Sequence, residues 1–383
     1  MGGGLFKFSS LMIPFIDFSR QNKLLKKKLL RAVAGVIDRQ AYILGPDVDT
    51  FEREFASYSG VKYAVGVASG FDAILLSLQA LGIGKGDEVI TVPNTFISTV
   101  LPILVVGARP VFVDVKSTTF LMNEALMEQY ITPRTKAIIP VHLFGLPVDM
   151  DPLMRIAKKY KLAIIEDACQ AHGAIYLPAG KAGKGRKAGS IGDVGCFSFY
   201  PSKNLGAFGD AGMVTTNRKD IAEKIRILRN IGQKEKNIHS VLGHNSRLDT
   251  MQAAMLRVKL PYLDQWVQKR RQLAYRYNSL LFGLPIVLPV EPESLKSSFH
   301  LYVIRTSRRD ALKRFLENNE VMCGVHYPTP IHLQPCMKEL GYKKGDFPVS
   351  EDGAREVLSL PLYPEMKAEE VDVVARIIRK FFT

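Results

Sequence analysis

Between residues 63 and 166 the sequence alternates short apolar segments with amphipathic ones, and this alternation constrains the fold more than any other feature. The apolar segments are typical of buried strands, whereas the amphipathic segments repeat their apolar residues at helical spacing. We expect strands at residues 63–67, 88–92, 111–115, 137–141 and 163–166, and helices at 72–81, 96–106 and 153–160. Such alternation predicts an α/β fold whose mainly parallel sheet is covered by helices on both faces.

Longer helical patterns flank this region. An amphipathic first helix is predicted from apolar residues that we expect to face the core: Leu24, Leu25, Leu29, Leu30, Val33 and Ile37. A long helical pattern over residues 250–281, interrupted at Pro261, leads into a strand at 301–306 and helices at 309–318 and 368–381. We therefore expect a large domain over residues 1–265 and a smaller α+β domain over 266–383.

Composition and charge argue against several classes of protein. The 383 residues are 47% hydrophobic and 23% charged, which is ordinary for a globular protein. The longest apolar stretch, residues 96–108, is too short to span a bilayer, so we expect no membrane partner. The net charge of +15 is spread over separate clusters without interleaved aromatic residues, which argues against a nucleic-acid partner. Four scattered cysteines without a Cys-x-x-Cys pair predict no metal cluster and a reduced, cytoplasmic setting.

Two consecutive acids, Glu166 and Asp167, stand at the carboxyl end of a predicted buried strand. Ligands of parallel α/β sheets bind at such strand ends, and a buried carboxylate needs a cationic or hydrogen-bonding partner. A protonated pyridine nitrogen is one such partner of Asp167, and a structural ion pair is the alternative. Gln170, shortly after, can reach a ligand, whereas we expect His172 to pack or to line a pocket rather than to bind a metal.

Lys203 lies in the turn that follows another predicted strand, at residues 196–199. A lysine amine can form an imine with the aldehyde of pyridoxal 5′-phosphate, and a strand-end carboxylate such as Asp167 can keep the pyridine nitrogen of that cofactor protonated. A solvated loop lysine is the alternative. The glycine-rich segment 205–212 implies that the backbone closely approaches another group there.

Three further segments supply groups that such a cofactor needs. Around Gly70 and Phe71 a predicted strand gives way to a helix, whose free N–H groups favour a phosphate; an ordinary capped helix is the alternative. Phe96 can stack on a flat ring or belong to the core, and Ser198 can donate a hydrogen bond to the phosphate. In contrast, the Gly/Lys-rich stretch 179–190 lacks the pattern of a P-loop and is expected to be an exposed, flexible loop.

Taken together, these motifs resemble those of the DegT/DnrJ-type sugar aminotransferases, which are fold-type I pyridoxal phosphate enzymes. The resemblance covers nearly the whole chain, because further matching segments begin at Ile13, Tyr42, Gly243 and His326. It implies that the amine of Lys203 binds the cofactor aldehyde and that Asp167 pairs with the pyridine nitrogen. Gln170 would approach the ring hydroxyl, and Phe96 would stack on the ring. The phosphate would be bound by Gly70, Phe71 and Ser198, together with Asn245 of a neighbouring subunit. Many members carry threonine in place of Phe71, so phosphate binding there must rely on backbone N–H groups.

The resemblance also implies the reaction and the partners. An amino group passes from L-glutamate to a nucleotide-linked keto sugar, in a homodimer whose active sites lie at the subunit interface. Tyr200 and residues 204–210 resemble the branch that acts on 3-keto sugars, which predicts a 3-amino-3,6-dideoxyhexose carried on dTDP or, alternatively, on UDP. Candidates for lining the sugar pocket are Tyr200, His326, Tyr327 and His332.

Three alternatives remain at this point. The nearest is the same fold acting on 4-keto sugars or on a cyclitol or aminobenzoate precursor. The sugar dehydratases of the family replace the cofactor-binding lysine by histidine, so the presence of Lys203 disfavours them. A non-catalytic regulator is disfavoured because Lys203, Asp167 and Gln170 occur together.

Overall fold

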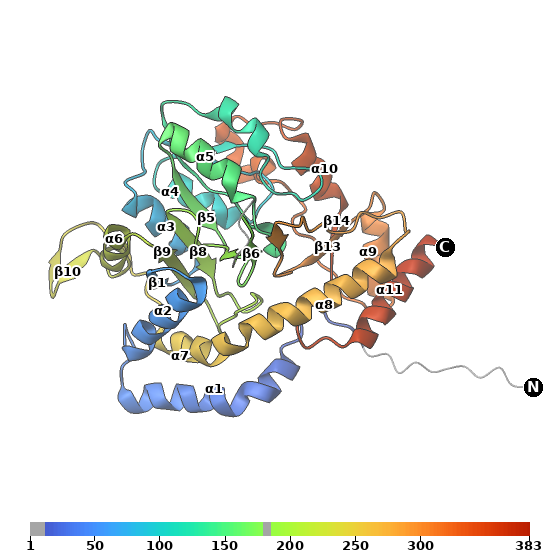
Figure 1. Cartoon of the computed structure of the whole chain (residues 1–383), viewed down its shortest axis with the longest axis horizontal. Coiled ribbons are helices and arrows are strands. Elements are labelled where there is room, and N and C mark those ends of the chain that lie inside the picture. Colours follow the sequence, from blue (N-terminus) through green and yellow to red (C-terminus); the bar gives the residue numbers. More distant parts are fainter. Residues whose placement is uncertain (1–11, 179–184) are drawn as a thin grey trace, which may run out of the picture.

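A seven-stranded sheet forms the centre of the protein in the computed structural model, which describes residues 12–178 and 185–383 (Figure 1). The order of its strands is β1 (Tyr63–Val67), β9 (Gly212–Thr216), β8 (Val194–Ser198), β5 (Ala163–Asp167), β4 (Thr135–Ile138), β2 (Glu88–Thr91) and β3 (Arg109–Phe112). Within this sheet β9 runs antiparallel to both of its neighbours, and the strands from β8 to β3 pair in parallel. The predicted α/β fold with a mainly parallel sheet is confirmed.

Helices cover both faces of the sheet (Figure 1). On one face α3 (Gly70–Ala80) and α6 (Lys219–Arg229) pack on Cys196 of β8, and on the other face α2 (Pro46–Ser59) and α7 (Thr250–Lys259) pack around Phe197. Adjacent strand residues thus belong to two different apolar clusters, as the alternation of side chains along a strand requires. The remaining helices of this part are α4 (Leu101–Val105) and α5 (Met150–Tyr160).

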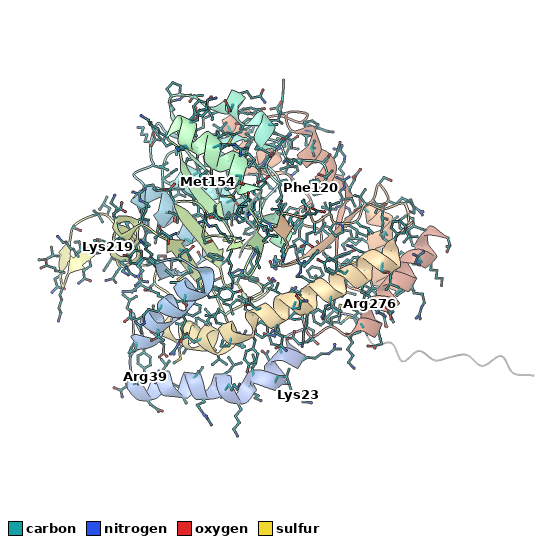
Figure 2. The ribbon with its side chains drawn as sticks, in the orientation of Figure 1. Lys23, Arg39, Phe120, Met154, Lys219 and Arg276 are labelled. Carbon is teal, nitrogen blue, oxygen red and sulfur yellow. The ribbon has the colours of Figure 1, made fainter. Side chains whose placement is uncertain are left out.

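The first helix, α1 (Ser19–Arg39), lies along α7 at the edge of the molecule. Figure 2 shows Lys23 and Arg39 near its two ends. Its buried stripe contains Leu25, Leu29 and Val36, with Val33 partly buried. The prediction of the inward face is wrong for three residues that are exposed, namely Leu24, Leu30 and Ile37. The apolar pattern is broader than the stripe that one neighbouring helix can cover.

The C-terminal part packs around its own apolar cluster. Helix α8 (Leu263–Leu281) begins in the cluster of the large sheet through Trp266 and ends in the C-terminal cluster through Tyr277, so the boundary expected near Gln265 falls within this helix. Residues of α9 (Arg309–Asn318), α11 (Ala368–Phe382) and the paired strands β13 (Tyr302–Arg305) and β14 (Val357–Leu360) join the C-terminal cluster. Helix α10 (Pro348–Glu356) directly precedes β14. Smaller strands are β6 (Ile175–Tyr176), β7 (Arg186–Lys187), β10 (Gln233–Glu235), β11 (Ile238–His239) and β12 (Leu295–Lys296). No helix within the described residues is long and apolar enough to cross a membrane.

Two segments differ from their predicted structure. The helix expected at residues 96–106 is instead a 3-10 turn, η1 (Ile97–Thr99), followed by the short α4, because Pro102 lacks an N–H group and starts a new helix. The stretch 179–190 is not an exposed loop where it is described: Ala188, Gly189 and Ser190 are buried. Residues 179–184 lie outside the described residues.

Candidate active site

A cavity of about 390 Å³ opens at the carboxyl ends of β5 and β8, next to the first turn of α3. Its volume lies within the roughly 300–1,000 Å³ that is usual for small-molecule sites. It brings together ten of the residues expected from the sequence: Gly70, Phe71, Phe96, Asp167, Gln170, Ser198, Tyr200, Lys203, His326 and Tyr327. Asn245 and His332 do not belong to its lining.

Lys203 is half-buried in the cavity, and its Nζ atom forms no hydrogen bond or ion pair with any residue in the ranges 12–178 and 185–383. The turn that carries it is well anchored, because Lys203 N donates to Tyr200 O at 2.8 Å and Asn204 Nδ2 donates to Ser298 O at 2.9 Å. Burial lowers the pKa of the Lys203 amine, against the opposing effect of Cys169 and Asp167. A larger neutral fraction makes this amine a better nucleophile and base than a solvated lysine.

Asp167 is the last residue of β5, and it lines the same cavity as Lys203. Its Oδ2 atom accepts a hydrogen bond from Thr99 Oγ1 at 2.6 Å, and Oδ1 accepts one from Cys169 N at 3.1 Å. No described lysine, arginine or histidine forms an ion pair with it, so the structural ion pair left open by the sequence is not found in the described part of the chain. The carboxylate is oriented by two donors and can still accept another from a ligand.

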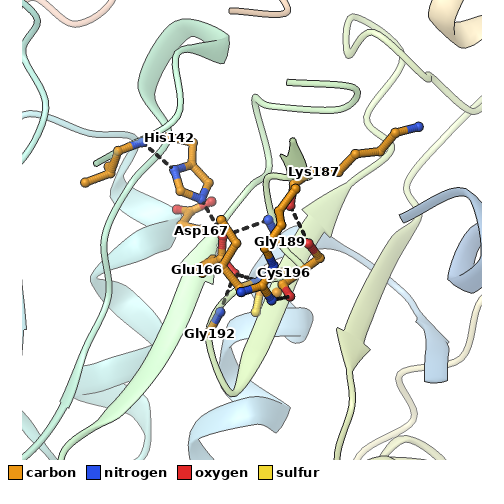
Figure 3. Close-up of polar contacts among 12 residues, drawn as sticks. His142, Glu166, Asp167, Lys187, Gly189, Gly192 and Cys196 are labelled. Carbon is orange, nitrogen blue, oxygen red and sulfur yellow. Dashed lines mark hydrogen bonds and ion pairs between the residues drawn. The ribbon is translucent and has the colours of Figure 1, made fainter. Parts of the chain in front are cut away.

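Glu166 points to the opposite side of β5 (Figure 3). Its Oε1 atom accepts hydrogen bonds from Ile191 N and Gly192 N at 2.6 and 2.7 Å, and Oε2 accepts from Gly189 N and His142 Nε2 at 2.8 and 2.9 Å. Burial acts to raise the Glu166 pKa, but these donors outweigh it and hold the pKa below its ordinary value. The two adjacent acids therefore differ: Glu166 is fully bonded within the protein, and Asp167 faces the cavity.

The first turn of α3 forms a cradle opposite Ser198. Ser69 caps the helix by accepting a hydrogen bond from Asp72 N at 3.1 Å, which leaves the N–H groups of Gly70 and Phe71 without helical acceptors. A Cβ atom on Gly70 would lie 2.7 Å from the Ser198 Cβ atom, so glycine permits this close approach. Free N–H groups, a helix N-terminus and a serine hydroxyl are the groups that bind a phosphate.

Aromatic and amide groups form the wall beside Lys203. Phe96 is 51% exposed, and its ring centroid lies 5.7 Å from that of Tyr327. Gln170 accepts from Phe144 N through Oε1 at 2.8 Å and donates through Nε2 to the Tyr327 hydroxyl oxygen at 3.0 Å, which leaves its second amide hydrogen free for a ligand. Burial lowers the pKa of His326 to about 4, so this ring is neutral at physiological pH.

Two of the expected histidines lie away from the cavity. His332, a candidate for lining the sugar pocket, is buried against Phe347 and bonds Glu351 Oε1 at 3.1 Å, so it does not line this cavity. His172 packs between Phe197 and Phe199, which agrees with packing rather than metal binding. Burial, helped by the charge of Lys203, lowers its pKa to about 3.

Several lining residues were not singled out as site residues by the sequence patterns, among them Thr99, Cys169 and His300. Thr99 follows the expected strand-end segment around Phe96, and Cys169 lies between Asp167 and Gln170. Their closeness in sequence to predicted site residues could therefore have indicated them. His300 comes from the C-terminal part, and no local pattern marks it. It reaches the cavity only through tertiary packing.

The chain is similar to known proteins over nearly its whole length. It is 45% identical over 373 residues to the "pleiotropic regulatory protein" of Geobacillus stearothermophilus, covering 97% of this chain and 98% of that protein. It is 44% identical over 370 residues to the dTDP-3-amino-3,4,6-trideoxy-alpha-D-glucose transaminase of Streptomyces venezuelae, covering 96% of each chain. The crystal structure of S. venezuelae DesV in complex with a ketimine intermediate matches with a TM-score of 0.93 and 44% identity, covering 97% of this chain and 98% of that chain. The family model for these aminotransferases matches residues 23–379, so the chain belongs to the DegT/DnrJ/EryC1/StrS aminotransferase family.

Proposed function

We propose that this protein uses pyridoxal phosphate to move an amino group from L-glutamate to a dTDP-linked 3-keto-6-deoxyhexose, giving the 3-amino sugar. The observation that carries the proposal is the unpartnered Lys203 amine in a cavity that it shares with Asp167 and the first turn of α3. The 44% identity to a dTDP-3-amino sugar transaminase supports the choice of the aminated carbon.

The residues present fit pyridoxal phosphate. Gly70, Phe71 and Ser198 provide a phosphate cradle that a Cβ atom on Gly70 would obstruct. Asp167 would hold the ring nitrogen and Phe96 would cover the ring. When bound, the cofactor supplies an aldehyde that takes up the amino group and a ring that accepts electrons.

Each of these side chains then has a defined task. Lys203 Nζ would bind the cofactor aldehyde and, as a free amine, would hold and move the proton at the reacting carbons, for which its lowered pKa is suited. Asp167, oriented by Thr99 and Cys169 N, keeps a proton on the pyridine nitrogen. Burial raises the pKa of Tyr327, so its hydroxyl stays protonated and acts as a donor beside the substrate.

A homodimer with shared active sites is part of the proposal. Exposed apolar residues gather on the β10–β11 hairpin, which projects from the body of the protein (Figure 1), and on the segments before and after it: Ile231, Ile238, Val241 and Leu242, the last being 96% exposed. Exposed apolar groups of this kind favour a protein partner. Asn245 follows this segment and is itself exposed, which supports the proposal that Asn245 of the partner subunit binds the phosphate.

Complementation between subunits tests the shared site. Lys203→Ala and Asn245→Asp homodimers should each be nearly inactive, and mixing them after mild dissociation should restore part of the activity, because each mixed dimer contains one intact site. Light scattering gives the oligomeric state. No recovery in verified mixed dimers would contradict the contribution of Asn245 across the interface.

A substrate panel tests the reaction itself. The protein loaded with pyridoxamine phosphate should regain the visible absorbance of bound pyridoxal phosphate when incubated with a dTDP-linked 3-keto sugar, and respond less to UDP-linked and 4-keto sugars. A stronger response to 4-keto sugars would overturn the assignment of the carbon. A protein that takes up no pyridoxal phosphate would overturn the aminotransferase proposal altogether.

A further inference from the structure

Hydrogen bonds and one short loop link the buried Glu166, on one side of β5, to Tyr327 in the cavity on the other. His142 Nε2 bonds Glu166 Oε2 at 2.9 Å, and His142 directly precedes the turn that contains Phe144. Phe144 N donates to Gln170 Oε1 at 2.8 Å, and Gln170 Nε2 donates to the Tyr327 oxygen at 3.0 Å. The fully bonded carboxylate thus connects to two groups that line the cavity.

The protonation of His142 follows from its contacts. Val148 N donates to His142 Nδ1 at 3.0 Å, so Nδ1 carries no proton and Nε2 must carry it. His142 therefore donates to Glu166 through Nε2. The negative charge of Glu166 is held by four N–H donors, three of them from the backbone, which is a strong and directional arrangement.

The direction of the remaining bonds follows in the same way. Phe144 N–H is a donor, so Gln170 must turn its oxygen towards Phe144 and its NH₂ group towards Tyr327. The Tyr327 oxygen accepts from that NH₂ group, which leaves the Tyr327 hydroxyl proton free to donate into the cavity. Phe144 has a left-handed backbone with φ of 58°, a conformation that a non-glycine residue adopts only when its surroundings hold it there.

We propose that Glu166 and His142 are positioning residues that fix the turn around Phe144, and through it the amide of Gln170 and the donor direction of the Tyr327 hydroxyl. The hydroxyl then recognises an acceptor oxygen of the sugar, either its carbonyl or a neighbouring hydroxyl. The identity of that ligand rests on the proposed function, whereas the positioning of Gln170 and Tyr327 does not.

Hydrogen exchange of the protein without substrate tests the positioning directly. Glu166→Gln keeps the side-chain volume but turns an NH₂ group towards N–H donors, so it should loosen residues 142–148. We expect amide exchange in this segment to become about tenfold faster or more, because a buried donor left without its partner destabilises the closed structure. Unchanged exchange of residues 142–148 would overturn the proposal.

The chain offers a matched control in Glu88, another buried sheet carboxylate. Glu88 lies at the opposite end of its strand from the cavity. It accepts hydrogen bonds from Thr132 Oγ1 and Arg134 Nη2, both at 2.6 Å. Glu88→Gln should lower the melting temperature without speeding exchange in residues 142–148. Equal exchange in the two variants at matched stability would mean that Glu166 acts on overall stability alone.

A double-mutant cycle tests the step from Glu166 to the ligand. If Glu166 acts through Tyr327, Glu166→Gln should lower kcat/KM about tenfold in the wild type and much less in a Tyr327→Phe background, because the two changes remove one interaction. If the losses of kcat/KM caused by the two substitutions instead multiply in the double variant, the substitutions act independently and this step is wrong. If the protein aminated none of the sugars, the proposed function would fail, but the exchange experiment would still decide whether Glu166 and His142 position Gln170.

Discussion

The two sides of β5 differ in how their polar groups are satisfied. On one side, Glu166 has four donors and His142 uses both ring nitrogens. On the other side, Lys203 Nζ has no described partner, and neither does His300 Nδ1. A fully satisfied buried network makes the structure rigid, whereas unpartnered polar groups cost stability and remain available to a ligand. The hydrogen-bonded network around Glu166 and the cavity that contains Lys203 thus lie on opposite sides of one strand.

Of the variants that test this comparison, Lys203→Ala has the largest expected effect. Removing the group that binds the cofactor and moves the proton should lower kcat/KM by at least about 10⁴-fold, as losses of a catalytic nucleophile usually do. The visible absorbance of bound pyridoxal phosphate should disappear as well. Absorbance spectra and steady-state rates with the sugar found in the panel would measure both effects.

Lys259→Met is the matched control for that variant. Lys259 is also buried, and burial lowers its pKa to about 8, but its amine donates to Gly206 O at 2.7 Å. The variant should lose stability and keep the visible absorbance. Loss of absorbance in Lys259→Met, with retention in Lys203→Ala, would reverse the roles assigned to the two lysines.

A second test compares the stability of variants of the two adjacent acids. Glu166→Gln should lower the free energy of unfolding by about 3 kcal/mol, because it leaves buried N–H donors facing an amide NH₂ group. Asp167→Asn should cost less than about 1 kcal/mol, since only two donors face it, yet it should lower kcat/KM about 10²- to 10³-fold through lost charge stabilisation. Urea unfolding and steady-state kinetics measure the two quantities. A larger stability loss for Asp167→Asn than for Glu166→Gln would contradict the difference described between the two sides of β5.

The sequence predicted much of the fold because its strands and helices have distinct periodicities. Strand β1 agrees at both ends, and β5 differs from its prediction by one residue. The pattern gave no signal for β9, a strand that begins with Gly212 and owes its place to pairing with β1 and β8. Such long-range pairing cannot be read from a local pattern.

The cavity was predictable where its residues lie at strand ends or in ordered motifs, as Asp167 and Lys203 do. The resemblance to the family singled out Asp167, but local patterning could not show that Glu166 is bonded on the opposite face, because the face that each residue occupies depends on the register of β5 in the sheet. His332 follows His326 by only six residues, but a 3-10 turn carries it to Glu351 instead of the cavity. Side-chain direction in irregular segments depends on tertiary packing.

The smallest test concerns the pH dependence of stability at His172, which packs against Phe197 and Phe199 outside the cavity. Folded His172 stays neutral down to its pKa of about 3, whereas in the unfolded chain it takes up a proton below about pH 6.5. The unfolded state therefore binds more protons between these values, and stability falls as the pH is lowered through this window. From about pH 7.5 to about pH 5, His172 alone should account for a loss of about 2 kcal/mol. Urea unfolding of the cofactor-free protein at both pH values should show that His172→Leu reduces the loss by this amount without abolishing it, because burial also lowers the pKa of His300 and His326. An unchanged pH dependence in His172→Leu would contradict the prediction and would mean that the ring finds a partner in solution.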